Sequence, residues 1–149
     1  MVTRNRIFLD TSALFAGIWS ATGGGRMLLK LGEAKAVKLL VSPDVLTEIE
    51  NVLRRKAPLS LGGLALLLDR SHVHIVPVAT PDLLKQSCAL VQYQADAGVL
   101  AAAWAANVDY FVTLDRQHFL NNERLRSAVP FPMGTPGDCL AWYRAQFFK

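Results

Sequence analysis

The sequence predicts an α/β protein, a three-layer α/β/α sandwich around a central, mostly parallel sheet of about five strands. Short runs rich in β-branched residues alternate along the chain with segments of helical periodicity, as expected for a parallel sheet covered on both faces. Helix-start signals, in which Ser or Thr precedes Pro, recur between these runs. We expect a single domain over residues 1–149, because a chain of 149 residues can bury one sizeable core.

Five strands are predicted from the apolar runs. The last of them is broken by Pro130 and Pro132, because proline has no backbone N–H to donate to a neighbouring strand. The predicted strands cover residues 7–10, 37–41, 73–78, 109–114 and 129–133.

Helices are predicted between the strands from apolar residues at helical spacing and from the start signals. A Ser-Pro-Asp sequence at 42–44 and a Thr-Pro-Asp sequence at 80–82 each combine a capping side chain, a proline in the first turn and an acid that the helix dipole favours. We expect the glycine-rich segment 20–25 to be a flexible loop, and Gly62 and Gly63 to weaken the helix that contains them. The predicted helices cover residues 14–19, 26–34, 43–55, 59–69, 82–91, 96–106 and 121–127, and a last one begins at 136.

Four acidic residues are candidates for a metal site. Asp10 and Asp115 each end a predicted strand, and Glu48 and Asp96 lie on predicted helices. Since the carboxyl ends of parallel strands meet at one edge of a sheet, these distant residues can converge there. Mg²⁺ and Mn²⁺ prefer oxygen ligands, and a bound cation would offset the repulsion between clustered carboxylates. Alternatively, the aspartates are ordinary turn or helix-cap residues and Glu48 is a solvated helix acid.

Hydroxyl side chains accompany both strand ends. Thr11 and Ser12 follow Asp10, and Thr113 precedes Asp115. Such hydroxyls can orient carboxylates or metal-bound water, so we expect them to assist the site.

The net charge favours a polyanionic partner. Sixteen Lys and Arg residues against twelve Asp and Glu residues give a formal charge of +4. If the four candidate acids are neutralised by metal, eight acids remain and the rest of the chain carries +8. This surplus suits nucleic acid, although a generic basic surface that aids solubility is the alternative. No apolar stretch reaches the ~18 residues of a membrane span, so we expect a cytoplasmic protein without a membrane partner.

Four motifs in order resemble the PIN domain family over nearly the whole chain. The opening motif at 8–12 (Phe-Leu-Asp-Thr-Ser) is followed by similar motifs at 42–49, 96–103 and 109–115. The family comprises metal-dependent nucleases, including toxin ribonucleases of VapC type. The resemblance implies that these four acids bind one or two Mg²⁺ or Mn²⁺ ions, that RNA is the substrate, and that a small antitoxin and a homodimer are expected. The metal-binding acids would be Asp10, Glu48, Asp96 and Asp115.

One position departs from the family pattern. Many relatives carry another acid just after the fourth motif, where this chain has Gln117 and His118. The number of bound ions is therefore open, and His118 could contact a phosphate or the leaving group, or be an exposed loop histidine.

Basic and aromatic residues near the acids are weaker candidates for RNA contacts. Trp19 could stack on a base, with core or dimer packing as the alternative. The basic candidates could contact phosphates or could be solvated surface residues. They are Arg26, Lys30, Arg54, Arg55, Lys56, Arg116 and His118.

The leading hypothesis is thus a metal-dependent endoribonuclease, and the family resemblance implies that it is the toxin of a toxin-antitoxin pair. A nucleic-acid-binding module without turnover is the main alternative, and it would bind RNA in a salt-dependent manner without cutting it. A phosphatase with Asp10 as nucleophile is disfavoured, because Ser12 occupies the place of the second acid that such sites use.

Overall fold

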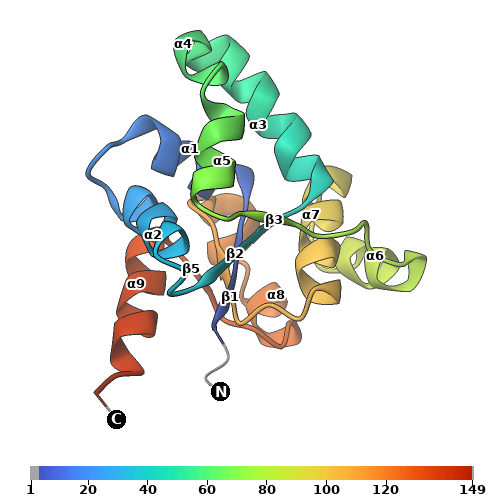
Figure 1. The fold of residues 1–149 in the computed structure, drawn as a ribbon. Helices are drawn as coiled ribbons and strands as arrows, with labels where there is room; N and C mark the ends of the chain where they lie inside the picture. The colour runs from blue at the N-terminus through green and yellow to red at the C-terminus, as the bar shows by residue number, and fades with distance from the viewer. Residues whose placement is uncertain (1–3, 149) are drawn as a thin grey trace.

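The chain folds around a five-stranded sheet in which every strand pair is parallel (Figure 1). This computed structural model describes residues 4–148. The strand order is β3-β2-β1-β4-β5, so that the first strand is central and the third and fifth are at the edges. The all-parallel sheet confirms the predicted α/β class. The strands are β1 (Arg6–Leu9), β2 (Lys38–Val41), β3 (His74–Ile75), β4 (Tyr110–Val112) and β5 (Met133–Gly134).

Helices lie on both sides of the sheet. In Figure 1, α2 and α9 are on one side of the strands, and α6, α7 and α8 are on the other. None of the helices described between residues 4 and 148 is long and apolar enough to cross a membrane. The helices are α1 (Thr11–Trp19), α2 (Gly24–Glu33), α3 (Pro43–Lys56), α4 (Pro58–Leu61), α5 (Leu64–Arg70), α6 (Pro81–Cys88), α7 (Gln94–Ala105), α8 (Glu123–Ala128) and α9 (Pro136–Ala145), with a π-helical turn η1 (Arg116–Leu120).

The core aligns the ends of the two strands that precede Asp10 and Asp115. Phe8 of β1 and Phe111 of β4 are fully buried and stack with ring centroids 5.4 Å apart. Burying a phenylalanine contributes about 1.5–3 kcal/mol, so this pair helps to hold the neighbouring strands in register. The backbone N–H of Asp10 then donates to the carbonyl of Val112 at 3.1 Å. The carboxyl ends of β1 and β4 therefore lie side by side.

The two edge strands are shorter than predicted. Strand β3 contains only two residues of the predicted 73–78, and Pro77 and the exposed Val78 lie outside the sheet. Strand β5 is Met133–Gly134 rather than 129–133. Prolines lack the N–H that a ladder needs, and an edge strand has a partner on one side only, so the pairing ends early.

Two glycine segments also differ from the prediction. Gly24 and Gly25, predicted to be in a loop, begin α2. Gly25 packs directly on Gly17 of α1, because a Cβ added at Gly25 would lie only 2.8 Å from the nitrogen of Gly17. At Gly62 and Gly63 the predicted helix 59–69 divides into α4 and α5. The first pair of glycines thus permits a close helix crossing that local sequence patterns do not reveal.

Candidate active site

Asp10 is held at the start of α1. Its Oδ1 atom accepts hydrogen bonds from the N–H of Ala13 at 2.9 Å and from the hydroxyl of Ser12 at 2.7 Å, so the residue caps the helix. The residue is only 6% exposed. Burial raises the pKa of Asp10 to about 6; the charge of Asp115 adds to this rise, while the hydroxyls of Thr113 and Ser12 and the amide of Ala13 oppose it. The protein thus keeps a poorly solvated carboxyl group at the end of its central strand.

Asp115 begins the π-helical turn η1. Its Oδ1 atom accepts from the N–H of His118 at 3.0 Å, and its backbone carbonyl accepts from the N–H of Leu120, five residues on, at 3.1 Å. This wide turn folds the imidazole of His118 back over the acids. Its Nδ1 atom lies 2.8 Å from Oδ2 of Asp115 and 3.3 Å from Oδ2 of Asp96. Such π-helical turns occur frequently at functional sites.

Asp96 and Glu48 approach the same place from two helices. Asp96 lies in the first turn of α7 and is half-buried, and Glu48 lies on α3 and is exposed. Burial raises the pKa of Asp96; His118 opposes this shift, and the charges of Asp115 and Glu48 add to it. Asp96 is not a helix cap, because Tyr93 occupies that position.

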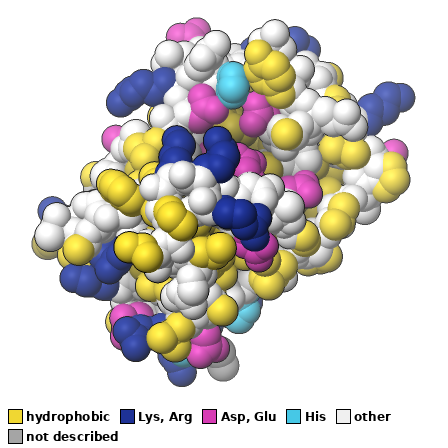
Figure 2. Space-filling view, turned by 90° about the horizontal axis from the view of Figure 1, so that it is seen from above, with side chains coloured by type: hydrophobic (Ala, Val, Ile, Leu, Met, Phe, Trp, Pro, Cys, Tyr) yellow, Lys and Arg dark blue, Asp and Glu magenta, His cyan; other side chains and the backbone are white. Residues whose placement is uncertain are grey.

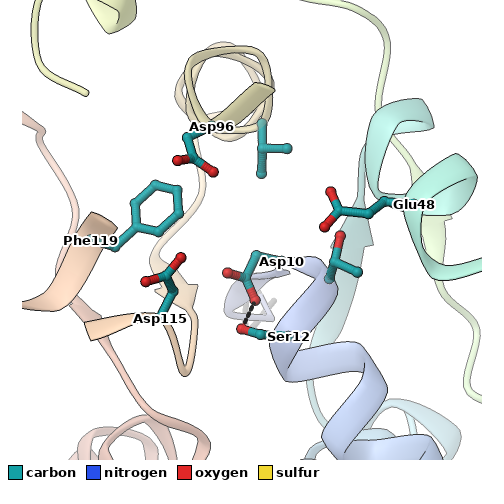
Figure 3. A pocket seen from close by; sticks show the side chains of 8 residues that line it. Asp10, Ser12, Glu48, Asp96, Asp115 and Phe119 are labelled. Carbon is teal, nitrogen blue, oxygen red and sulfur yellow. Dashed lines mark hydrogen bonds between the residues drawn. The ribbon is translucent and has the colours of Figure 1, made fainter. Parts of the chain in front are cut away.

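The four acids line one cavity, and Figure 3 shows their carboxylates directed toward a common space. The cavity has a volume of about 80 Å³, enough for two or three water molecules at roughly 30 Å³ each. Figure 2 shows acidic side chains running across the face seen from above, with Lys and Arg side chains beside them. The lining residues are Asp10, Thr11, Ser12, Glu48, Asp96, Val99, Asp115 and Phe119.

The three hydroxyl residues contact the acids or the space between them. Ser12 Oγ donates to Asp10, accepts from the N–H of Leu114 at 2.9 Å and lies 3.4 Å from Thr113 Oγ1. Thr113 Oγ1 accepts from the N–H of Asp115 at 3.0 Å. These contacts connect the ends of β1 and β4. Thr11 Oγ1 is buried at the cavity and has no hydrogen-bond partner among residues 4–148.

The donor set fits a hard divalent cation. Four carboxylates and the hydroxyl of Thr11 offer the oxygen ligands that Mg²⁺ and Mn²⁺ prefer. Within the described part of the chain, however, no three Asp, Glu, His or Cys side chains are already gathered as a metal cluster. Without a cation between them the carboxylates repel one another and stay apart. We therefore expect them to draw closer when a divalent cation binds.

The basic candidates have different surroundings. Arg26 caps α1: its Nε donates to the carbonyl of Gly17 at 2.6 Å and its Nη2 to that of Ile18 at 2.9 Å, so the guanidinium that we predicted to contact RNA is used within the fold. Lys30 is exposed on α2 and, like Arg116, does not line the acid cavity. Arg54, Arg55 and Lys56 are exposed at the end of α3.

Sequence patterns missed three residues of the site. Phe119 and Val99 line the cavity, and Tyr93 packs against His118 with ring centroids 4.7 Å apart. His118 follows Asp115 by three residues, the spacing between a helix-capping side chain and the residue that it caps. This spacing could have indicated the contact between Asp115 and His118. The positions of Phe119 and Val99 depend on the packing of separate helices, for which the sequence offered no signal.

The fold and the acid cavity define an α/β protein with clustered carboxylates at the carboxyl ends of parallel strands. The family model of the PIN domain matches residues 6–117, and the chain belongs to this family. The comparison with curated proteins returned no match.

Several solved structures have the same fold. The chain is similar to VapBC2 from Rickettsia felis bound to a DNA fragment from its promoter, with 18% identity, a TM-score of 0.61 and coverage of 86% of this chain and 96% of that chain. DNA-bound VapBC from Salmonella typhimurium has 15% identity and a TM-score of 0.64, with coverage of 89% of this chain and 98% of that chain. VapC20 from Mycobacterium tuberculosis, a toxin that cleaves the sarcin-ricin loop, has 22% identity and a TM-score of 0.53, with coverage of 74% of this chain and 91% of that chain.

Proposed function

We propose that the protein is an endoribonuclease that depends on one or two Mg²⁺ or Mn²⁺ ions. The observation that carries this proposal is the convergence of four acids, from four separate elements, on one cavity. Membership of the PIN domain family supports it. The basic remainder of the chain favours a polyanionic substrate.

The four acids would bind the ion and position the attacking water in the proposed reaction. Asp10, Asp96 and Asp115 would hold the ion, and Glu48 would hold it or position the attacking water. A bound divalent cation supplies activation of water and neutralisation of the charge that develops on the phosphodiester. Ser12 orients Asp10 through its 2.7 Å hydrogen bond. Thr11, whose hydroxyl has no partner within the described part of the chain, would offer it to a water molecule or a phosphate oxygen.

We further propose that this nuclease is the toxin of a toxin-antitoxin pair, acts in the cytoplasm and forms a homodimer. Similarity in fold to the VapBC proteins of Rickettsia felis and Salmonella typhimurium supports the pairing with a small antitoxin. Exposed apolar side chains, among them Met27 and Phe147, are compatible with a second copy. A small open reading frame next to the gene is the expected genomic sign of the antitoxin, and its absence counts against the toxin role only.

Cleavage of defined RNAs tests the nuclease function. The wild type should cut single-stranded RNA with added Mg²⁺ or Mn²⁺ and stop with a chelator. Asp96→Asn should reduce the rate about 10²-fold or more, because it removes a ligand from a cation that contributes several kcal/mol. Gel analysis of end-labelled RNA measures both effects.

Asp69→Asn is the matched control, because it removes the same charge from an exposed position on α5. It should cleave like the wild type. Full activity of Asp96→Asn would contradict the assignment of Asp96. Intact RNA that nevertheless binds with a strong salt dependence would favour the alternative of a binding module without turnover.

A second prediction concerns His118. Its imidazole contacts the carboxylates of both Asp96 and Asp115, so these two residues would hold a cation together only if the imidazole moved away. His118→Ala is therefore expected to bind Mn²⁺ more tightly than the wild type in isothermal titration calorimetry. His72→Ala, which changes a histidine outside the acid cavity, should leave the affinity unchanged. Weaker Mn²⁺ binding by His118→Ala would instead indicate that the imidazole is itself a ligand.

A further inference from the structure

A larger groove opens beside the acid cavity, between α1 and α3. It has a volume of about 460 Å³ and shares Thr11, Ser12 and Glu48 with the acid cavity. A ligand bound at the acids could therefore extend into the groove without leaving the protein surface. Its other lining residues are Phe15, Ala16, Trp19, Ser20, Val52, Lys56 and Leu114.

The groove has an aromatic wall on α1. Phe15 and Trp19 lie one helical turn apart and stack with ring centroids 5.8 Å apart and an angle of 17° between their planes. Trp19 is 64% exposed although it belongs to a helix next to the core. An exposed large apolar side chain at a concave site is a feature of ligand-binding grooves. The two rings are nearly parallel, and most of the surface of Trp19 stays accessible to a ligand.

The opposite wall carries positive charge. The Nζ atom of Lys56, the last residue of α3, lies 5.9 Å from the ring centroid of Phe15. Arg54 and Arg55 directly precede Lys56 but do not line the groove, whereas the acidic Glu48 does. None of these three basic side chains forms an ion pair with a carboxylate among residues 4–148. Their charges are thus available to a polyanion.

We propose that this groove is a nucleobase-binding subsite for single-stranded RNA. Trp19 stacks on one unpaired base next to the scissile phosphate, and Lys56 contacts a phosphate beside that base. An aromatic platform next to a cation is the combination by which proteins grip single strands. A base within a duplex has no free face, so the subsite selects unpaired RNA. This inference rests on the proposed nuclease function.

A double-mutant cycle tests the stacking contact. Dissociation constants are measured by fluorescence anisotropy for a short RNA and for copies with one abasic nucleotide at each position in turn. The proteins are Asp10→Asn, which keeps the RNA intact, and the same variant with Trp19→Ala. For the complete RNA, Trp19→Ala is expected to weaken binding roughly 5- to 150-fold, because stacking on one base contributes about 1–3 kcal/mol.

The abasic series identifies the base. At one position near the acid cavity, loss of the base should weaken binding as much as Trp19→Ala does, with little further loss when both changes are combined. Equal additive losses at every position would overturn the proposal. Leu59→Ala is the control, because Leu59 is 99% exposed and lies outside this groove. Trp19→Phe should retain most of the affinity.

Salt dependence tests the phosphate contact. Lys56→Gln should reduce the slope of log Kd against log salt concentration by about 0.7, the value for one phosphate contact on a single strand. An unchanged slope would exclude Lys56 from the subsite.

The outcomes separate this inference from the nuclease proposal. A wild type that fails to cleave RNA while the cycle shows coupling contradicts the nuclease activity and supports the base subsite. Cleavage without coupling contradicts the base subsite alone. Unchanged RNA binding by Trp19→Ala, together with lost binding of a partner protein, would mean that the groove docks a protein and that the base-binding proposal is wrong.

Discussion

Asp10→Asn is expected to stabilise the metal-free protein at neutral pH while it slows RNA cleavage about 10²-fold or more. The folded protein raises the pKa of Asp10 from 3.8 to about 6, mainly because the carboxyl group is buried. The native state therefore binds a proton that the unfolded state releases between these pH values. As the pH rises from about 4 to 6, the free energy of unfolding falls, and the loss above pH 6 amounts to roughly 3 kcal/mol at most.

Asparagine avoids this loss because it does not ionise. Its side-chain oxygen can still accept the hydrogen bonds from Ala13 and Ser12, and Asn caps helices about as well as Asp. We expect Asp10→Asn to gain about 1–3 kcal/mol at pH 7.5, with the gain disappearing toward pH 4. Urea denaturation of the chelator-treated protein at several pH values measures this difference. Asp69→Asn, at an exposed site, should show no such gain.

Added Mn²⁺ should reverse the order of stability. A ligand that binds only the native state stabilises it, so the wild type should gain stability with Mn²⁺ and Asp10→Asn should gain little. The same variant should lose RNA cleavage about 10²-fold or more, as expected for a lost ligand of a catalytic cation. An Asp10→Asn variant that is less stable than the wild type at pH 7.5 would show that its carboxylate stabilises the fold.

Gly25→Ala is expected to destabilise the protein by about 2–3 kcal/mol, because it forces two helices apart. The added Cβ would lie 2.8 Å from the nitrogen and 3.0 Å from the Cα atom of Gly17. Both atoms belong to the backbone of α1, so no side-chain rotation can relieve the overlap. Any gain in helix propensity from alanine, at most about 1 kcal/mol, is smaller than this cost.

Gly62→Ala provides the comparison within the same chain. Gly62 has a right-handed helical backbone, and a Cβ there would meet nothing within 4 Å. This substitution should be neutral or stabilise by roughly 0.4–1 kcal/mol, because alanine restricts the unfolded chain. Thermal and urea unfolding measure both variants. Equal stability of Gly25→Ala and the wild type would contradict the tight crossing of α1 and α2.

Sequence patterns predicted the central part of the fold well and its edges less well. Strands β1, β2 and β4 are mostly buried, and each appears in the sequence as a short apolar run that local patterns can identify. Strand β3 is reduced to His74–Ile75, and β5 lies at Met133–Gly134. The extent of an edge strand depends on pairing with one neighbour and on nearby prolines, which a run of β-branched residues does not report.

The acids of the candidate site could be predicted because the carboxyl ends of parallel strands meet at one edge of a sheet and because carboxylates are common ligands of Mg²⁺ and Mn²⁺. Asp10 and Asp115 follow adjacent parallel strands, so the topology alone brings them together. The spacing of three residues between Asp115 and His118 could have indicated their contact, but the contact of His118 with Asp96 could not be predicted, because it depends on the π-helical turn and on the position of α7. The capping role of Arg26 likewise depends on how closely α1 and α2 cross.

The sequence by itself thus determined the α/β class, the PIN domain family and the four acids that lie at one cavity. The α/β class follows from short-range periodicity, the acids from residue types at strand ends and on predicted helices, and the family from the resemblance of four motifs in order. Only the tertiary structure decided that Asp10 is buried, that Thr11 Oγ1 has no hydrogen-bond partner among residues 4–148 and that Trp19 lines a groove beside the acids. Burial and groove shape arise where helices distant in sequence pack together, and their side chains exclude water only in the assembled fold.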